Sequence, residues 1–485
     1  MVKTLEIPLR EVRRRMADDN PWWMAGGGIE PEWRDLPRRA YFAPLMRLVR
    51  DVDVSRAVVL IGPRRVGKTV MLKQAIEALL ADGITGVDIL YLSLETPLYS
   101  GRALETLLRD YMDLHGHPKG KPLWVFFDEV QYLRDWEVHL KSLVDSYRSI
   151  RFVVSGSAAA TLKMKSRESG AGRFSDFLLP PLTFAEYLMF AGIESDLIVE
   201  EEAEAGRVPV YRARNILELN AAFIDYLNYG GFPEAVMKPA VRANPDRFLK
   251  QDIVDKVLLK DLPSLFGIRD TQELNRFFNV LAYNTGEEVK PESLSKHSGI
   301  EKNKIADYLE YLEAAFLIRR VHRIGDNARR LQRATTFKIY LTNPSIRAAL
   351  FGYIRDDDEA MGQLAETALW SQWLHSASTI DSLHYARWKQ GRRDSEVDLV
   401  AVDPRTQAPR FAVEVKWSDS AFDHWNELQG LRDFASRHKL QRNPLVTTLT
   451  KTGQGKDKVT RLEIDFVPTS LHCYTIARNL LRQSG

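Results

Sequence analysis

The sequence is poor in cysteine and in long apolar runs. Its single cysteine, Cys473, excludes an intrachain disulfide and a zinc site built from several cysteines, which fits a reducing compartment. No apolar run reaches the roughly 18 residues that a membrane-spanning helix needs, and the first residues lack the apolar core of a secretory signal. We therefore expect a soluble protein of the cytoplasm that has no membrane partner.

The sequence also lacks a large excess of charges of one sign. The 68 basic side chains stand against 65 acidic ones, so the net charge of +3 does not by itself indicate a nucleic-acid binder. A hydrophobic content of 45% with 27% charged residues is ordinary for a globular protein and excludes wholesale disorder. At 485 residues the chain is too long for one compact core, and we expect two to four domains.

What the sequence does have, from residue 57 onward, is a regular alternation of short apolar segments with longer helical ones. The expected strands are 57–61, 89–94, 123–127 and 152–155, and the expected helices between them are 70–81, 103–114 and 136–147. This alternation is typical of a parallel sheet that is covered by helices on both faces. The preceding residues hold several tryptophans around a glycine run, and we interpret them as an irregular arm that packs on a neighbouring surface.

Residues 62–69 fit the phosphate-binding pattern G-x-x-x-x-G-K-[ST] between an apolar strand and an apolar-periodic helix. The nucleotide-binding residues predicted from it are Gly62, Pro63, Arg64, Arg65, Val66, Gly67, Lys68 and Thr69. Backbone amides of such a loop point at phosphate oxygens, and the following helix N-terminus adds positive potential. Lys68 is expected to reach the β- and γ-phosphates, and Thr69 to offer its hydroxyl to Mg²⁺. The pattern therefore predicts ATP and Mg²⁺ as cofactors.

Two adjacent acids, Asp128 and Glu129, follow the apolar segment 123–127. At the carboxyl edge of a parallel sheet they reach the ligand crevice, so Asp128 is expected in the Mg²⁺ shell and Glu129 as the group that polarises the attacking water. Ser157, at the end of the next strand, is our candidate for sensing the γ-phosphate. Arg173 is a candidate for charge compensation within the subunit or on a neighbour's nucleotide, and an ordinary surface arginine is the alternative.

Several motifs in this order resemble one group of AAA-type ATPases. They are FDEVQ at 127–131, SGS at 155–157, GR at 172–173, PPLTFAEYL at 180–188 and YGGFPEAV at 229–236. That group, found in bacteria and archaea, carries a C-terminal domain of the DUF-4143 class. The resemblance implies an α/β fold class in which a P-loop AAA-type parallel sheet domain precedes a helical, winged-helix segment and an α/β domain similar to PD-(D/E)xK restriction endonucleases.

The domain limits expected from this resemblance divide the chain into five parts. They are an N-terminal arm at 1–40, the AAA-type domain at 41–190, a helical lid or linker at 191–270, a winged-helix-like domain at 271–325 and a nuclease-like domain at 326–485. We also expect a homo-oligomer, in the form of a ring. In the winged-helix-like domain, the second helix of the helix-turn-helix at 292–316 carries several acids, so a packing role is favoured over base readout.

The segment 319–338 has a net charge of +6, which exceeds the balance of the whole chain. Its basic residues are Arg319, Arg320, Arg323, Arg329, Arg330, Arg333 and Lys338. Such a run fits contacts to a phosphate backbone and would make binding salt-sensitive. A solvated loop or a subunit contact is the alternative interpretation.

Three positions near the C-terminus match the order of acids in the PD-(D/E)xK fold. Glu414 and Lys416 are two apart on one expected strand, and Asp398 is on its neighbour. Two carboxylates can hold Mg²⁺, and the lysine can orient or deprotonate the attacking water. Glu366, on the helix that opens this domain, would complete the metal site.

These features together predict an ATP-binding and ATP-hydrolysing protein that acts in DNA processing. Its C-terminal domain would bind DNA, branched DNA included, and endonuclease activity stays open. One alternative is an ATP-driven remodeller of branched DNA that does not cut. The other is a nucleotide-switch regulator, for example in defence against phage.

Overall fold

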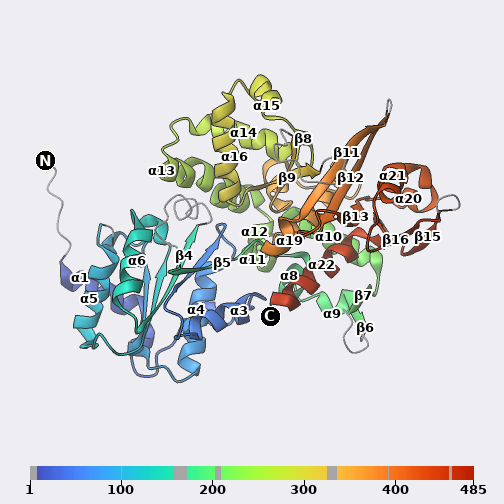
Figure 1. Ribbon diagram of the computed structural model, residues 1–485. Coiled ribbons are helices and arrows are strands. Elements are labelled where there is room, and N and C mark those ends of the chain that lie inside the picture. Colours follow the sequence, from blue (N-terminus) through green and yellow to red (C-terminus); the bar gives the residue numbers. More distant parts are fainter. Residues whose placement is uncertain are drawn as a thin grey trace. The chain divides into compact units, whose positions relative to one another are not determined.

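The computed structural model describes residues 8–99, 101–157, 172–201, 209–324, 336–390, 393–457 and 461–484. The chain forms two compact units, shown in Figure 1. Unit 1 comprises Met1–Leu179 with Ser484–Gly485, and unit 2 comprises Pro180–Gln483. The five domain limits expected from the sequence stay predictions.

Unit 1 is built on a five-stranded sheet in the order β2-β3-β4-β1-β5, in which all pairings are parallel. Its strands are β1 (Ala57–Gly62), β2 (Ile89–Ser93), β3 (Leu123–Asp128), β4 (Ile150–Ser157) and β5 (Phe174–Leu178). The four strands β1 to β4 are almost wholly buried, which is why they appear in the sequence as continuous apolar runs.

Helices cover both faces of this sheet, as the alternating pattern predicts. Helix α5 (Leu104–His115) packs against α1 (Leu9–Asp19) and α6 (Trp136–Ser146), whereas α4 (Lys68–Ala81) packs against α2 (Pro31–Arg34) and α3 (Phe42–Arg50). Figure 1 shows the two groups on opposite sides of the strands. The expected parallel α/β fold of unit 1 is thereby confirmed.

The segment before residue 40 is more regular than the sequence suggested. It contains α1 and α2, and it contacts the edge strand β2 of the sheet. The Asn20 side chain donates to the carbonyl of Tyr91 over 2.8 Å and accepts from its amide over 2.6 Å. Trp22 and Trp23 both donate from their indole nitrogens to the carbonyl of Ile89. The expectation of an irregular arm is wrong for 9–19, and the expectation that its aromatics pack is right.

Unit 2 contains a nine-stranded mixed sheet in the order β15-β16-β14-β13-β12-β11-β9-β10-β8. Its strands are β8 (Glu288–Val289), β9 (Ile318–Ile324), β10 (Phe337–Leu341), β11 (Leu383–Gln390), β12 (Arg393–Val402), β13 (Pro409–Glu414), β14 (Leu445–Thr448), β15 (Gly453–Lys456) and β16 (Glu463–Pro468). Strands β9 and β10 pair with each other, and β9 also pairs with β11. One sheet therefore connects the expected winged-helix-like segment with the expected nuclease-like domain.

The remaining elements of unit 2 are mostly helical. The small pair β6 (Ile198–Glu201) and β7 (Val210–Ala213) stands apart from the large sheet. The helices before the large sheet are α8 (Phe184–Phe190), α9 (Glu194–Leu197), α10 (Ile216–Tyr229), α11 (Pro233–Met237), α12 (Pro239–Arg242), a π-helical stretch over Asp246–Asp255 and Val257–Asp261, α13 (Leu262–Phe266) and α14 (Thr271–Tyr283). The later ones are α15 (Pro291–Ser298), α16 (Lys302–Ala314), α17 (Ser345–Phe351), α18 (Met361–Trp373), α19 (Ala377–Ile380), α20 (Ser420–Asp423), α21 (Gln429–Arg437) and α22 (Thr469–Ser484).

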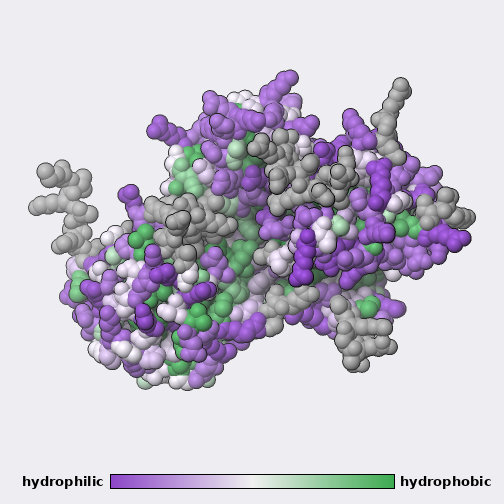
Figure 2. Space-filling model, viewed as in Figure 1, coloured by the Kyte–Doolittle hydropathy of each residue, from purple (hydrophilic) through white to green (hydrophobic). Residues whose placement is uncertain are grey.

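Within the described residues, none of the helices combines the length and the apolar character that crossing a membrane requires. The face drawn in Figure 2 is mainly hydrophilic.

Candidate functional site

The phosphate-binding loop lies between the end of β1 and the start of α4. Two of its glycines are required by geometry. A Cβ atom on Gly62 would lie 2.3 Å from the carbonyl oxygen of Leu179, and Gly67 has a φ of +95°. The loop therefore curls closely over the sheet edge, in a backbone conformation that larger residues rarely adopt.

Lys68 begins helix α4 and points back into the loop. Its ammonium donates to the carbonyl oxygens of Gly62 over 3.1 Å and of Pro63 over 2.9 Å, and the residue is only 5% exposed. Arg39, from the N-terminal segment, donates to the carbonyl of Val66 over 2.8 Å. The loop is thus supported by a residue that the sequence patterns did not indicate.

Asp128, at the end of β3, is the centre of the site. Its Oδ2 accepts hydrogen bonds from the Thr69 hydroxyl over 2.8 Å and from the Tyr91 hydroxyl over 2.9 Å. Its Oδ1 accepts from the Ser155 hydroxyl. A threonine hydroxyl and a carboxylate side by side are the oxygen donors that Mg²⁺ prefers, so these residues fit the metal of an ATP site. Burial, followed by the Asp128 charge, raises the pKa of Tyr91 well above its ordinary value, so this hydroxyl remains a donor.

Glu129 follows in a left-handed backbone conformation, with a φ of 58°. Its amide donates to Ser155 Oγ over 3.1 Å, and its Oε2 accepts from the side-chain amide of Gln131. The other end of that amide, Oε1, accepts from the backbone N–H of Ser157 over 3.0 Å. The structure therefore brings together Asp128, Glu129 and Ser157, and it adds Tyr91, Gln131 and Ser155.

Arg173 lies immediately before β5. Its Nε is 3.1 Å from Oδ1 of Asp145, and its side chain is 43% exposed. Ion pairing to an acid of the same unit is the behaviour of a surface arginine. A role in charge compensation stays a prediction.

In unit 2 the predicted C-terminal residues lie close to one another. Lys416 Nζ is 2.9 Å from Glu414 Oε1, although β13 ends at Glu414 and the lysine lies beyond the strand. Asp398, on the neighbouring β12, accepts the backbone N–H of Val415 over 2.7 Å. The carboxylate of Asp398 is also among the charges that raise the pKa of Glu414.

A lysine that the sequence analysis assigned to the basic run lies among these acids. Lys338, on β10, is 4% exposed, and its Nζ lies 2.9 Å from Glu366 and 4.0 Å from Asp398 and also contacts Glu396. Tyr340 donates to the same oxygen of Glu366. We call Glu366, Glu396, Asp398, Glu414, Lys338 and Lys416 the C-terminal acid cluster.

Burial and mutual repulsion govern the pKa values of this cluster. Burial raises the pKa of Glu366 to about 7 against the opposing effect of Lys338, and it raises the pKa of Glu414 to about 8. Burial alone lowers the pKa of Lys338, but the surrounding acids, Glu366 foremost, outweigh it and raise the pKa well above its ordinary value. When all four carboxyl groups are ionised, they outnumber the two ammonium groups and the guanidinium of Arg387, which lies 3.7 Å from Glu396, so the cluster has a deficit of positive charge.

A divalent cation fits this deficit at one position. Oε2 of Glu414 is buried and makes no hydrogen bond, so it has a free lone pair beside Asp398. Asp398 and Glu414 would hold a metal there, whereas Glu366 is engaged by Lys338 and Tyr340. Among the described residues, three or more acid, histidine or cysteine side chains do not converge on one metal position.

The basic run is only partly described. Arg319 lies 2.7 Å from Asp381, and Arg320 pairs with Glu313 at 2.6 Å, so both are engaged in ion pairs. Arg323, on β9, is partly buried. The other candidates for phosphate contacts, Arg329, Arg330 and Arg333, lie outside the described residues.

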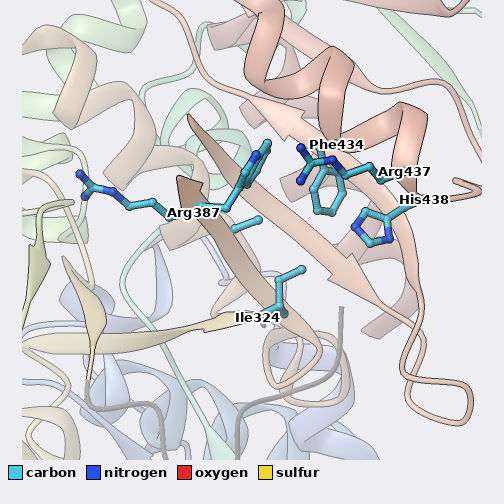
Figure 3. Close-up of a pocket in the computed structure, with 7 residues that line it drawn as sticks. Ile324, Arg387, Phe434, Arg437 and His438 are labelled. Atoms are coloured by element: carbon cyan, nitrogen blue, oxygen red, sulfur yellow. The ribbon is translucent and has the colours of Figure 1, made fainter. Parts of the chain in front are cut away.

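Figure 3 shows a pocket between β11 and α21, with Phe434, Arg437 and His438 on one side and Arg387 pointing away from them. Trp388 lies in this pocket, where its ring is 6.0 Å from that of Phe434 and 5.4 Å from the guanidinium of Arg437. Trp388 is partly buried and packs against the apolar core of this part of unit 2.

The geometry of unit 1, a parallel sheet with a phosphate loop and an acid pair at its carboxyl edge, is that of a P-loop domain. Comparison with known families agrees: residues 54–188 match the family model described as an AAA domain. The chain therefore carries a P-loop AAA domain. Residues 220–357 match a domain of unknown function, DUF8612. That match does not confirm the DUF-4143-class assignment.

Three uncharacterized proteins are similar to this chain. One from Haemophilus influenzae is 28% identical over 56% of this chain and 64% of its own length. Two from Methanocaldococcus jannaschii, MJ1544 and MJ1637, are 25% and 24% identical over 56% and 75% of this chain and 58% and 76% of their own lengths. The matched part of this chain thus spans about six tenths of the length of the first two relatives. A solved structure of PCH-2 from C. elegans matches 45% of this chain and 67% of that one at 14% identity, with a TM-score of 0.29.

Proposed function

We propose that this protein binds ATP with Mg²⁺ and hydrolyses it. The observation that carries the proposal is the contact between the Thr69 hydroxyl and the Asp128 carboxylate beside a curled phosphate loop. The loop amides and Lys68 bind the phosphates, and Glu129 orients the attacking water and accepts its proton. Mg²⁺ supplies charge that offsets the phosphate oxygens.

The test separates binding from turnover. Glu129→Gln keeps the shape of the side chain but loses the base, so ATP binding should persist while turnover falls at least about 100-fold. Lys68→Ala should weaken binding itself, because the charge directed at the phosphates is lost. Glu32→Gln, a change of an exposed acid in α2, is the matched control. Wild-type turnover in Glu129→Gln would contradict the role of that carboxylate.

The ATP cycle is proposed to act on DNA through the nuclease-like part of unit 2, in a homo-oligomeric ring in the cytoplasm. The acid cluster with its E…D…ExK order and the basic run support this proposal. DNA should then stimulate ATP hydrolysis. Very slow hydrolysis without any effect of DNA would favour the nucleotide-switch regulator instead.

Mg²⁺-dependent DNA cleavage is a second candidate function, and the buried, unpartnered Oε2 of Glu414 next to Lys416 favours it. Mg²⁺ or Mn²⁺ should support cutting of duplex, single-stranded or four-way DNA. Glu414→Ala should abolish it because the metal loses a carboxylate, and Lys416→Ala should slow it while metal binding persists. Glu310→Ala, at an exposed acid of α16, is the control. Equal trace cutting by wild type and Glu414→Ala would favour the remodeller that does not cut.

A further inference from the structure

The ends of β3 and β4 are joined by one side chain whose role the phosphate-loop motifs do not specify. Gln131 lies two residues after Glu129, and its amide contacts both the Glu129 carboxylate and the backbone of Ser157. The orientation of this amide is fixed by Ser157, because a backbone N–H can only donate. Oε1 must therefore face Ser157, and Nε2 must face Glu129.

Ser157 has a second feature that points to a ligand. Ser157 is 5% exposed, and its hydroxyl oxygen is buried without a hydrogen-bond partner. A buried hydroxyl without a partner is costly, so a group that supplies one is expected at this position. Ser157 ends the strand beside β3, at the edge where Asp128 and the phosphate loop lie.

The backbone of Glu129 also needs a restraint. With a φ of 58° it occupies a conformation that is uncommon for a residue with a side chain, and the Ser155 hydroxyl holds its amide. Neither feature fixes the direction of the carboxylate itself. Within the described residues, the Glu129 carboxylate accepts one hydrogen bond, and Gln131 donates it.

We propose that Gln131 is a positioning residue that holds the Glu129 carboxylate in a fixed position relative to the end of β4. This inference rests on the proposed ATP hydrolysis. Ser157 contacts the γ-phosphate through its hydroxyl, and its N–H fixes Gln131, which in turn fixes Glu129. The base is thereby aligned with the same strand end that contacts the phosphoryl group to be transferred. Gln131 itself touches neither nucleotide nor water.

Two substitutions of Gln131 test its two hydrogen bonds, to Ser157 and to Glu129. Gln131→Met keeps the length of the side chain and removes both hydrogen bonds. Gln131→Glu keeps an acceptor for Ser157 but places a negative charge beside Glu129. Both should lower kcat about 10- to 100-fold with KM for ATP within about twofold, because only alignment in the transition state is lost.

A double-mutant cycle distinguishes positioning from a general structural role. In a Glu129→Gln background, Gln131→Met should cause no further loss, because the carboxylate that it positions is already absent. Gln74→Met is the matched control, since Gln74 is a buried glutamine of the same unit that donates to the carbonyl of Leu36 over 2.9 Å. Its effect should be the same factor in both backgrounds.

Wild-type kcat in Gln131→Met, with Glu129→Gln inactive, would overturn this proposal alone. An equal loss from Gln131→Met in both backgrounds would overturn it too, because that is the result of a structural role. Wild-type turnover in Glu129→Gln would overturn the assignment of the base together with this proposal.

Discussion

Single side chains in this protein connect elements that are far apart in the sequence. Asp128 is the clearest case, because hydroxyls from α4, β2 and β4 converge on its two oxygens. Glu414 shows the opposite arrangement, since one of its oxygens pairs with Lys416 and the other is buried without a partner. A carboxyl group in that situation binds a proton or a cation more readily than a solvated one does.

Glu414 should therefore make stability depend on pH. Burial, followed by the Asp398 carboxylate, raises its pKa to about 8, whereas an unfolded glutamate titrates near 4.3. Between these values the native state holds a proton that the unfolded state has lost. The free energy of unfolding should then fall as pH rises through this range, by up to about 1.4 kcal/mol per pH unit, and reach its lower limit above the folded pKa.

Glu414→Gln should remove this fall, because the neutral amide does not titrate. Urea unfolding of both proteins in EDTA, from about pH 5 to about pH 9, measures the effect. Parallel curves for wild type and variant would contradict the raised pKa.

At the scale of elements, β10 ties the helix-turn-helix region to the acid cluster. It pairs with β8 and β9, and its Lys338 reaches Glu366 on α18 and two acids on β12. The strand is buried along its whole length, so the ammonium has left water and depends on these acids. The contact between this strand and α18 is thus electrostatic as well as apolar.

Lys338→Met should destabilise unit 2 by about 3–5 kcal/mol, because it leaves buried carboxyl groups without their cation. The unfolding transition of unit 2 in urea measures this loss. Lys256→Met is the control: that lysine is half exposed and pairs with Asp252 one helical turn away, so a change of about 0.5 kcal/mol or less is expected. A loss of similar size in both variants would contradict the role of Lys338.

For the whole molecule, the proposed link between ATP and DNA joins chemistry in unit 1 to binding in unit 2. Arg319 and Arg320 are ion-paired, and Arg323 is partly buried on β9. The expected contribution to DNA binding therefore falls mainly on Arg329, Arg330 and Arg333. Contacts of that kind act on phosphates and do not distinguish sequences.

Replacing these three arginines together by alanine should weaken binding to all DNA sequences alike and flatten the dependence of log affinity on log salt by about 0.9 per lost phosphate contact. Binding measured over a range of salt concentrations tests this. ATP hydrolysis without DNA should be unchanged, since the phosphate loop keeps its ligands. An unchanged salt slope would place the DNA path elsewhere or exclude DNA as a ligand.

The sequence by itself determined the features that depend on neighbouring residues. The buried strands β1 to β4, the helices between them and the phosphate loop were predictable because periodicity and loop geometry are local properties. The positions of Asp128, Glu129, Glu414 and Lys416 followed from the same local rules, since each is at or near the end of an apolar strand.

Only the tertiary structure decided which distant side chains complete each site. Tyr91 lies 37 residues before Asp128, and Lys338 lies 28 residues before Glu366, and no spacing rule relates such pairs. Lys338 also shows why composition misleads: in the sequence it is one more cation of a basic run, but burial among acids makes it part of the acid cluster. Hydrogen bonds and ion pairs form across strand neighbours in the sheet, and the order of those strands is set by the packing of the whole unit rather than by any one segment.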